Sequence, residues 1–228
     1  MFGAAVADSV VVHIPWTAEA GAGCLLTAST ALWLTLSGRG WHGFVAAGFG
    51  LFGLIWSGMG AATIVCEVPA TEAARAVTGR SDVQVVCAGP VFGGQMLNPN
   101  DDGWVMFSAA GRPETVAHVT GKQCAQVRSW RYLRTPGRAT LEQARAINTV
   151  VHEAEHLSGI TNEAVAECAA VQDIPAAVVA MGGTDAEGRA IAAQFYGYWY
   201  PMMPDAYRSS DCVDGGPLDT LRPGPVPG

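Results

Sequence analysis

The stretch INTVVHEAEHLSGITNEAVAEC, from Ile147 to Cys168, contains two histidines four residues apart, with a glutamate directly after the first. Hydrophobic residues recur at helical spacing in and before this stretch and predict a helix over residues 141–157. In such a helix His156 lies about 40° around the axis from His152, away from the apolar stripe. Two imidazoles that are one turn apart can reach the same ion.

Glu153 points about 100° away from His152 and is badly placed to act as a third ligand of the same kind. It can, however, reach a water molecule held by the ion, which is the chemistry that an H-E-x-x-H pattern serves. The imidazoles hold Zn²⁺, and the carboxylate takes the water's proton and delivers it to the leaving amine. We therefore predict His152 and His156 as zinc ligands and Glu153 as the catalytic base. The alternative is a solvated helix face that happens to contain two histidines.

This motif resembles the zincin metallopeptidases, and more closely the membrane-anchored HExxH proteins of high-GC bacteria that continue as HExxHL.GI..EA..EC. The resemblance extends from Val150 to about Gln172, with weaker similarity in VVCAGPVFGG and DCVDGGPLD. It implies a zincin-like domain that binds Zn²⁺ and hydrolyses peptide bonds.

The resemblance leaves the third zinc ligand open. In the metzincin branch, a glycine three residues past the second histidine breaks the helix and a ligand follows three residues later. Gly159 fits that glycine, but Asn162 at the ligand position is a poor zinc ligand. NEAVAE instead resembles the NExxxE segment of the gluzincin branch, although that segment normally lies further along the chain. We predict Glu163 as the third ligand, brought back by a turn at Ser158 and Gly159, with Glu167 as the alternative.

Four further features of the sequence have weaker functional readings. Glu155 points away from Glu153, which favours a surface role. Asp173 is predicted to cap a helix before Pro175, with support of a metal ligand as the alternative. His118 is predicted to be structural rather than a ligand. The aromatic run QFYGYWYPMMP, residues 194–204, is predicted to pack in the core, and secondarily to line a substrate groove or a membrane-surface rim.

Two uncharged, mostly apolar runs precede the soluble part of the chain. They cover residues 20–38 and 40–66, and each is about as long as the ~20 residues that cross a bilayer. We predict a transmembrane helix pair within residues 20–66, after an N-terminal segment of residues 1–19. A single helix over residues 43–65 and buried core helices are the alternatives. Small residues at small-xxx-small spacing would favour helix–helix association in the membrane: Ala46, Gly50, Gly53 and Ser57.

The sparse positive charge predicts the orientation of this pair. Arg39, between the two runs, is the only Lys or Arg before Arg75, and the positive-inside bias places it in the cytoplasm. The protein is then a cell-membrane protein, attached through residues 20–65, whose domain from Glu67 onward is extracytoplasmic. The net charge of −7, with basic residues scattered singly, argues against a nucleic-acid partner.

The cysteines agree with an extracytoplasmic domain. Four of them are spread along the soluble part without CxxC spacing, which favours disulfides in an oxidising compartment. Four cysteines allow three pairings, and the sequence does not decide among them; we predict one bond between Cys168 and Cys212 and a second between Cys87 and Cys124. Cys24 and Cys66 lie within or at the end of the apolar runs and are poor partners for that set.

The remaining patterns predict an α+β, mostly helical domain over residues 67–213. A short helix starts at Glu67 and ends at Gly79, a strand follows from Asp82, and WVMFSA is a second strand after the turn signal NPNDDG. Residues 114–130 are left unassigned. Helices dominate from Thr140, including one that begins near a capping box of Thr184 and Glu187. Residues 214–228 are too rich in Pro and Gly to pack and are predicted to form a flexible tail.

Together these features predict a membrane-anchored zinc metallopeptidase that cleaves peptide or protein substrates outside the cell. The alternative is a non-catalytic membrane protein in which a structural or relic zinc site belongs to an interaction domain. A catalytic zinc keeps one coordination position open for water, whereas a structural zinc takes four protein ligands.

Overall fold

The computed structural model describes residues 66–88, 102–135 and 137–220, which lie in one compact unit, Val65–Gly228. The predicted membrane helices, their association surface and the N-terminal segment lie outside the described residues. No helix within the described ranges combines the length and apolarity needed to cross a membrane. The unit is α+β and mostly helical, as predicted.

Within the described residues, three strands and four long helices follow a helical segment at residues 66–78. In chain order they are β1 (Gln84–Ala88), β2 (Gly103–Phe107), β3 (Pro113–Thr120), α3 (Gly121–Leu133), α4 (Leu141–Leu157), α5 (Glu163–Ala180) and α6 (Asp185–Tyr198), followed by the 3-10 turns η1 (Tyr200–Met202) and η2 (Asp205–Tyr207). The unassigned residues 114–130 thus form most of β3 and α3.

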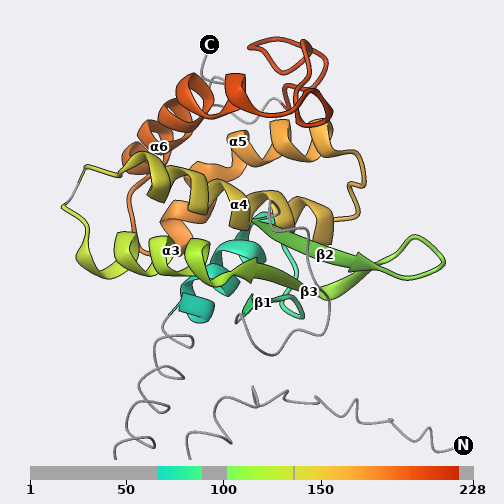
Figure 1. Cartoon of the computed structure of the whole chain (residues 1–228), viewed down its shortest axis with the longest axis horizontal. Helices are drawn as coiled ribbons and strands as arrows, with labels where there is room; N and C mark the ends of the chain where they lie inside the picture. The colour runs from blue at the N-terminus through green and yellow to red at the C-terminus, as the bar shows by residue number, and fades with distance from the viewer. Residues whose placement is uncertain (1–65, 89–101, 136, 221–228) are drawn as a thin grey trace, which may run out of the picture. The chain divides into compact units, whose positions relative to one another are not determined.

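The sheet has the order β1–β3–β2, with β1 parallel and β2 antiparallel to the central strand. Alternate side chains of β3, Ala117 and Val119, are fully buried, as period-two burial on one face of a sheet requires. Helix α4 lies between this sheet and the pair α5 and α6 (Figure 1). It also contacts α3, so it is the central element of the domain.

Both ends of α4 are defined by side chains and by one glycine. Thr140 and Gln143 form a reciprocal capping box at its start. At its end Ser158 is the C-cap residue, and Gly159 has a φ of 99°, which a residue with a Cβ rarely adopts. The predicted helix over residues 141–157 is confirmed. The turn at Gly159 reverses the chain, so that α5 starts close to the end of α4.

Two expectations about polar residues on these helices are wrong. Glu155 is buried rather than on the surface, because the sheet and helices surround α4 and leave it little exposed face. Asp173 does not cap a helix, because α5 continues through Pro175. Ile174, directly before that proline, and Ala177, two residues after it, are fully buried, so tertiary packing outweighs the cost of a proline inside the helix.

The predicted flexible tail begins later than Asp214. The side chain of Gln172 on α5 donates a hydrogen bond to the carbonyl of Leu218 (2.9 Å) and accepts one from the backbone of Thr220 (2.8 Å). Leu218 also packs against the core. Because one amide side chain satisfies two backbone groups, the Pro- and Gly-rich chain is attached up to Thr220. Residues 221–228 lie outside the described part.

Both predicted disulfides are present. Cys87 in β1 is bonded to Cys124 in α3, and Cys168 in α5 is bonded to Cys212. The second bond holds the C-terminal segment beside the helix that starts with Glu163. Loops of these lengths are costly to close in the unfolded chain, so each bond stabilises the fold by a few kcal/mol in the chain-entropy model.

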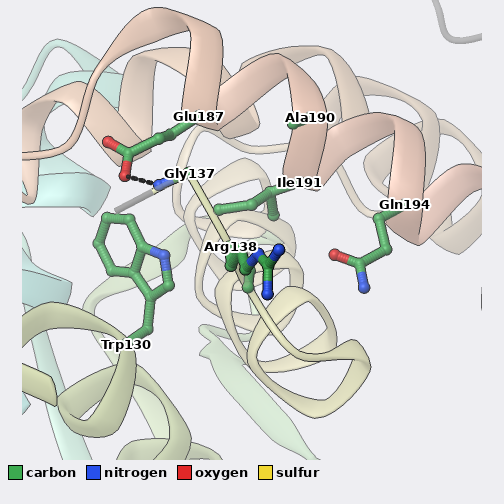
Figure 2. A pocket seen from close by; sticks show the side chains of 8 residues that line it. Trp130, Gly137, Arg138, Glu187, Ala190, Ile191 and Gln194 are labelled. Carbon is green, nitrogen blue, oxygen red and sulfur yellow. Dashed lines mark hydrogen bonds between the residues drawn. The ribbon is translucent and has the colours of Figure 1, made fainter. Parts of the chain in front are cut away.

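Glu187 joins the α3–α4 connection to the start of α6, beside a cavity of about 250 Å³ (Figure 2). Its carboxylate accepts hydrogen bonds from the backbone N–H groups of Gly137 (3.0 Å) and Thr184 (2.8 Å), and Arg134 lies 3.3 Å away. The hydrogen bonds from these backbone groups, ahead of that from Arg134, lower the pKa of Glu187 to about 2. The predicted capping box of Thr184 and Glu187 is confirmed.

We expect Gly188→Ala to destabilise the protein, because a Cβ at this position would lie 2.4 Å from the backbone Cα of Pro175. Forcing α5 and α6 apart should cost about 1–3 kcal/mol of unfolding free energy, measured by urea denaturation. Gly197→Ala in the same helix is the matched control, because a Cβ there meets nothing within 4 Å. That change should leave stability unchanged or raise it by up to about 1 kcal/mol. Equal losses in both variants would contradict the close packing at Gly188.

We expect Glu187→Gln to lower the melting temperature at pH 7 and to have a smaller effect at pH 3. The pKa of Glu187 in the folded state lies below its ordinary value of 4.5, so its stabilisation is complete above that value and is lost as the pH falls toward about 2. Glu114→Gln, at an exposed carboxylate, is the control and should change little at either pH. A loss that is the same at pH 7 and pH 3 would show that charge is not involved.

Candidate metal centre

The two histidines of the motif project from adjacent turns of α4 and approach each other closely. Both are 6% exposed, and their Nε2 atoms are 3.0 Å apart. The rings are nearly perpendicular, with an interplanar angle of 87°. The pair therefore presents two nitrogens to one point rather than stacking its rings.

Glu163, the first residue of α5, completes a group of three ligand atoms. Its Oε2 lies 3.1 Å from Nε2 of His152 and 3.3 Å from Nε2 of His156. In a tetrahedral zinc site, atoms bound at 2.0–2.1 Å from the ion are separated by roughly 3.3 Å. The three separations, 3.0, 3.1 and 3.3 Å, are close to that value. The turn at Gly159 brings the carboxylate to this point.

Asn162 and Glu167, the other residues considered for the third ligand, have different contacts. The side chain of Asn162 accepts a hydrogen bond from the backbone of Val165 (3.0 Å) and so caps α5. Glu167 lies one turn further along, with Oε2 2.6 Å from Nδ1 of His152 and Oε1 accepting from Asn148 (2.7 Å). Glu167 thus contacts the ring nitrogen of His152 that faces away from the other two ligand atoms. A carboxylate in that place orients a ligand histidine.

His156 is held in the same way by the backbone. Its Nδ1 lies 2.6 Å from the carbonyl oxygen of Ile160, which can only accept a hydrogen bond. With Nδ1 of both rings protonated toward these acceptors, both Nε2 atoms carry lone pairs. Two lone pairs and the carboxylate oxygen of Glu163 then face one another within 3.3 Å. This donor set fits a divalent cation such as Zn²⁺, for which imidazole and carboxylate are ordinary ligands.

The electrostatics of the group reflect the same need for positive charge. Burial opposes the charged form of His152, but hydrogen bonds to Glu163 and Glu167 outweigh it and raise the pKa of His152 to about 10. Hydrogen bonds from both histidines lower the pKa of Glu163 to about 2. A proton therefore supplies positive charge between these side chains, and a cation that binds there displaces protons.

Glu153 lies beside the three ligand atoms but does not belong to them. It is 4% exposed, and burial raises the pKa of its carboxyl group to about 7. The side chain extends toward β2, where a Cβ built on Gly103 would lie 2.8 Å from its Oε1. The absence of a side chain at position 103 therefore makes room for the carboxylate. The sequence patterns did not indicate this role of Gly103.

A cleft of about 600 Å³ runs past His152 and Glu153. One side is polar and includes Arg145 on α4, which forms an ion pair with Asp102 (2.6 Å) at the start of β2. The other side is mainly apolar and comes from α6 and the turns after it: Phe195, Trp199, Met202, Met203, Pro204 and Tyr207.

The aromatic run of residues 194–204 divides between two predicted roles. Tyr200 is buried in the core, Phe195 is buried and also borders the cleft, and Trp199 and the two methionines line the cleft. Sequence reasoning did not find Asp102 or Tyr207, because each is brought to the cleft by an element distant in the chain from the motif. The cation–π contact between Arg145 and Trp199 (4.8 Å) crosses from α4 to the end of α6.

His118 lies apart from this cluster. Its ring stacks on Trp104 of the neighbouring strand, with centroids 4.6 Å apart and an interplanar angle of 10°. Burial lowers the pKa of His118, which favours the neutral ring. These contacts agree with its predicted structural role.

Comparison with known proteins gives no independent assignment. No protein-family model, no curated protein and no solved structure matches this chain. The geometry and donor chemistry of the site alone therefore identify a candidate metal centre.

We expect the purified full-length protein to bind about one zinc ion and to lose it when His152 or His156 is changed to alanine, because two ligands hold the ion weakly against a chelator. Glu163→Ala should also lose the ion. Glu167→Gln should weaken zinc affinity by about 10- to 100-fold, because it disturbs only the orientation of His152. Affinity would be measured by competition with a chromogenic chelator.

Glu142→Gln is the matched control for these variants, because Glu142 lies in the first turn of α4 and is half exposed. Its zinc affinity should equal that of the wild type. Wild-type affinity in Glu163→Ala together with loss in Glu167→Gln would assign the third ligand to Glu167 instead.

Proposed function

We propose that this protein is a zinc-dependent metallopeptidase, anchored in the cell membrane through residues 20–65, that hydrolyses peptide bonds of extracytoplasmic peptides or proteins. The observation that carries the proposal is a buried carboxylate, Glu153, which lies next to a group of three convergent donor atoms and lines the same cleft as His152. A purely structural zinc site has no need of such a neighbour.

The number of protein ligands also supports a catalytic role. Within the described ranges, the cluster on α4 and α5 contains three residues that could hold one ion: His152, His156 and Glu163. Catalytic zinc sites use three protein ligands and leave a position for water or substrate, whereas structural sites use four. When bound, Zn²⁺ would supply Lewis-acid activation that lets a water molecule lose its proton near neutral pH.

The chain's own residues would then carry the remaining steps. Glu153 takes the proton from the attacking water and passes it to the leaving amine, a role that needs a carboxylate able to hold a proton near neutral pH. Glu167 and the carbonyl of Ile160 keep the two imidazoles oriented throughout. The buried setting of Glu153 excludes bulk water and strengthens its electrostatic contact with the reacting groups.

The sheet offers a place for the substrate backbone. Strand β2 pairs only with β3 among the described strands, so its other edge can hydrogen-bond an extended peptide. Gly103 of β2 is also the residue against which Glu153 packs. A peptide that adds to this edge would therefore pass close to the proposed base. The two disulfides agree with an oxidising, extracytoplasmic location.

We expect Glu153→Gln to keep its zinc and to lose peptide hydrolysis by about 10²- to 10⁴-fold, because an amide cannot accept the water's proton. The measurement uses the full-length protein in detergent with a library of internally quenched fluorescent peptides. Glu142→Gln is again the control and should retain wild-type turnover. Removal of zinc with a chelator should abolish hydrolysis, and added zinc should restore it.

Two outcomes would contradict the proposal. Undiminished hydrolysis by Glu153→Gln would show that Glu153 is not the base. Absence of hydrolysis by zinc-loaded wild-type protein across the library would favour the non-catalytic alternative, in which the zinc site belongs to an interaction domain.

A further inference from the structure

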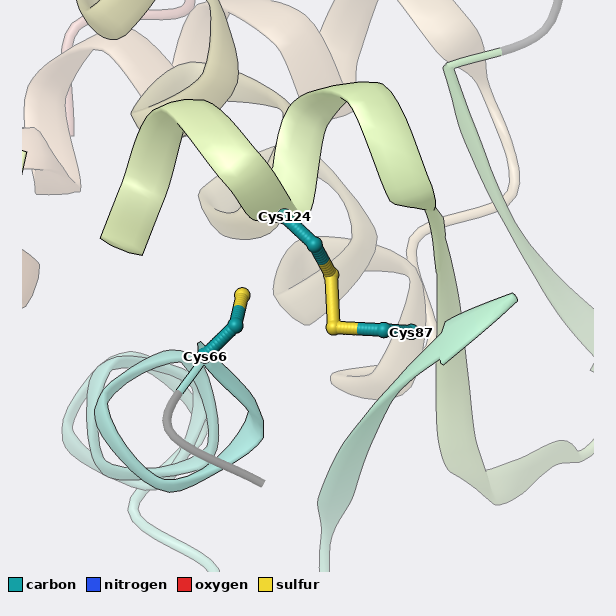
Figure 3. Close-up of side chains that lie close together, drawn as sticks. All are labelled: Cys66, Cys87 and Cys124. Atoms are coloured by element: carbon teal, nitrogen blue, oxygen red, sulfur yellow. A yellow bond between two sulfur atoms is a disulfide. The ribbon is translucent and has the colours of Figure 1, made fainter. Parts of the chain in front are cut away.

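A second cluster of reactive side chains lies away from the proposed metal centre. Cys66, at the start of the helix over residues 66–78, is a free thiol and is 1% exposed. Its sulfur and the two sulfurs of the Cys87–Cys124 bond all lie within 4.8 Å of one another. In Figure 3 the Cys66 side chain points toward that disulfide, between β1 and α3. A free thiol so close to a disulfide is a potential exchange partner.

We propose that these three cysteines form a site of internal thiol–disulfide exchange, in which Cys66 can replace Cys124 as the partner of Cys87. The sulfur of Cys66, as a thiolate, attacks Sγ of Cys87 and forms a new S–S bond. The Cys87–Cys124 bond breaks, and its electron pair leaves on Sγ of Cys124. The proton lost from Cys66 goes to solvent, and Cys124 takes up a proton from solvent. One thiol and one disulfide remain, so no oxidant or reductant is consumed.

Two features direct the attack to Cys87 rather than to Cys124. Cys87 is partly exposed, whereas Cys124 is buried. Cys124 also lies at the fourth position of α3, whose first turn contains no acidic residue. The positive end of a helix dipole stabilises a thiolate there, which makes the sulfur of Cys124 the better leaving group. Exchange therefore releases Cys124.

The surroundings of Cys66 keep this exchange slow in the native state. Burial, followed by the nearby charge of Glu67, raises the pKa of the Cys66 thiol to about 12, while Arg128 on α3 acts in the opposite direction. Glu67 itself accepts a hydrogen bond from the backbone N–H of Cys87 (2.9 Å). Because only the thiolate attacks, exchange requires alkaline pH or opening of the start of this helix.

Exchange would change which parts of the domain are cross-linked. The native bond joins β1 to α3, whereas the exchanged bond joins the start of the first described helix to β1. Cys66 is also the last residue of the apolar run over residues 40–66, which is predicted to cross the membrane. The alternative bond would therefore fix the entry of the chain into the domain. This inference does not depend on the proposed peptidase activity.

The test uses full-length wild-type protein incubated without reductant at pH 7.0 and pH 9.5. Samples are quenched with acid, free thiols are alkylated, and unreduced peptides are mapped by mass spectrometry. We expect a peptide pair that joins Cys66 to Cys87, together with alkylated Cys124. Below the pKa of the Cys66 thiol, the rate of its formation should rise about tenfold for each unit by which the pH increases. Cys168–Cys212 should stay intact and serves as the internal control.

The variant Cys124→Ser gives a second readout. After oxidation with glutathione disulfide, a folded Cys124→Ser protein should contain a Cys66–Cys87 bond. Cys168→Ser is the matched control, and its Cys212 should form no bond with Cys66. The proposal is overturned if wild-type protein at pH 9.5 contains only the native bonds, or if Cys66 appears bonded to Cys124, Cys168 or Cys212. A folded Cys124→Ser protein in which Cys66 and Cys87 are both alkylated would also overturn it.

Discussion

Two neutral imidazole nitrogens cannot remain 3.0 Å apart with a carboxylate oxygen beside them unless positive charge lies among them. The surrounding structure holds these three atoms close together instead of letting them move apart. Glu167 contacts Nδ1 of His152, and the carbonyl of Ile160 contacts Nδ1 of His156. Neither ring can therefore turn its Nε2 lone pair away without losing a close polar contact. The turn at Gly159 then adds negative charge through Glu163. A proton supplies part of this positive charge. A divalent cation would supply more of it, and the three donor atoms are spaced as such an ion requires.

Such a group can persist only on a rigid support, and α4 provides one. The helix is enclosed by the sheet, α3, α5 and α6, and its apolar residues Ile147, Val150 and Val151 are fully buried. Burial on one side fixes the rotation of the helix, which in turn fixes the direction of the two histidines. Because only four residues lie between the C-cap of α4 and the start of α5, the carboxylate of Glu163 is positioned by local chain geometry. The disulfide between Cys168 and Cys212 further restrains α5.

Local signals in the sequence predicted much of this arrangement. The period of α4, the glycine at its end and the capping box at Thr184 depend on neighbouring residues alone, so they could be recognised without a structure. The expectations that failed depend on tertiary contacts. A proline normally ends a helix, but α5 continues through Pro175 because Ile174 and Ala177 are packed in the core.

The candidate site divides in the same way. His152, Glu153, His156 and Glu163 come from one short stretch, and the pattern brought them to attention together. Asp102, Gly103 and Tyr207 reach the cleft from distant parts of the chain, and no local pattern marks them. The tail to Thr220 was also mispredicted, because its attachment depends on one amide group of α5.

The contact between Gly103 and Glu153 links the sheet edge to the proposed base. Position 103 has no side chain, so the carboxylate lies directly against the backbone of β2. One residue earlier, Asp102 is paired with Arg145, so the start of the strand is fastened to the helix that carries the base. The start of β2 and the carboxylate of Glu153 are consequently held together, and a shift of one displaces the other. The distance between a peptide backbone lying on that edge and the proposed base is thus set before any ligand binds.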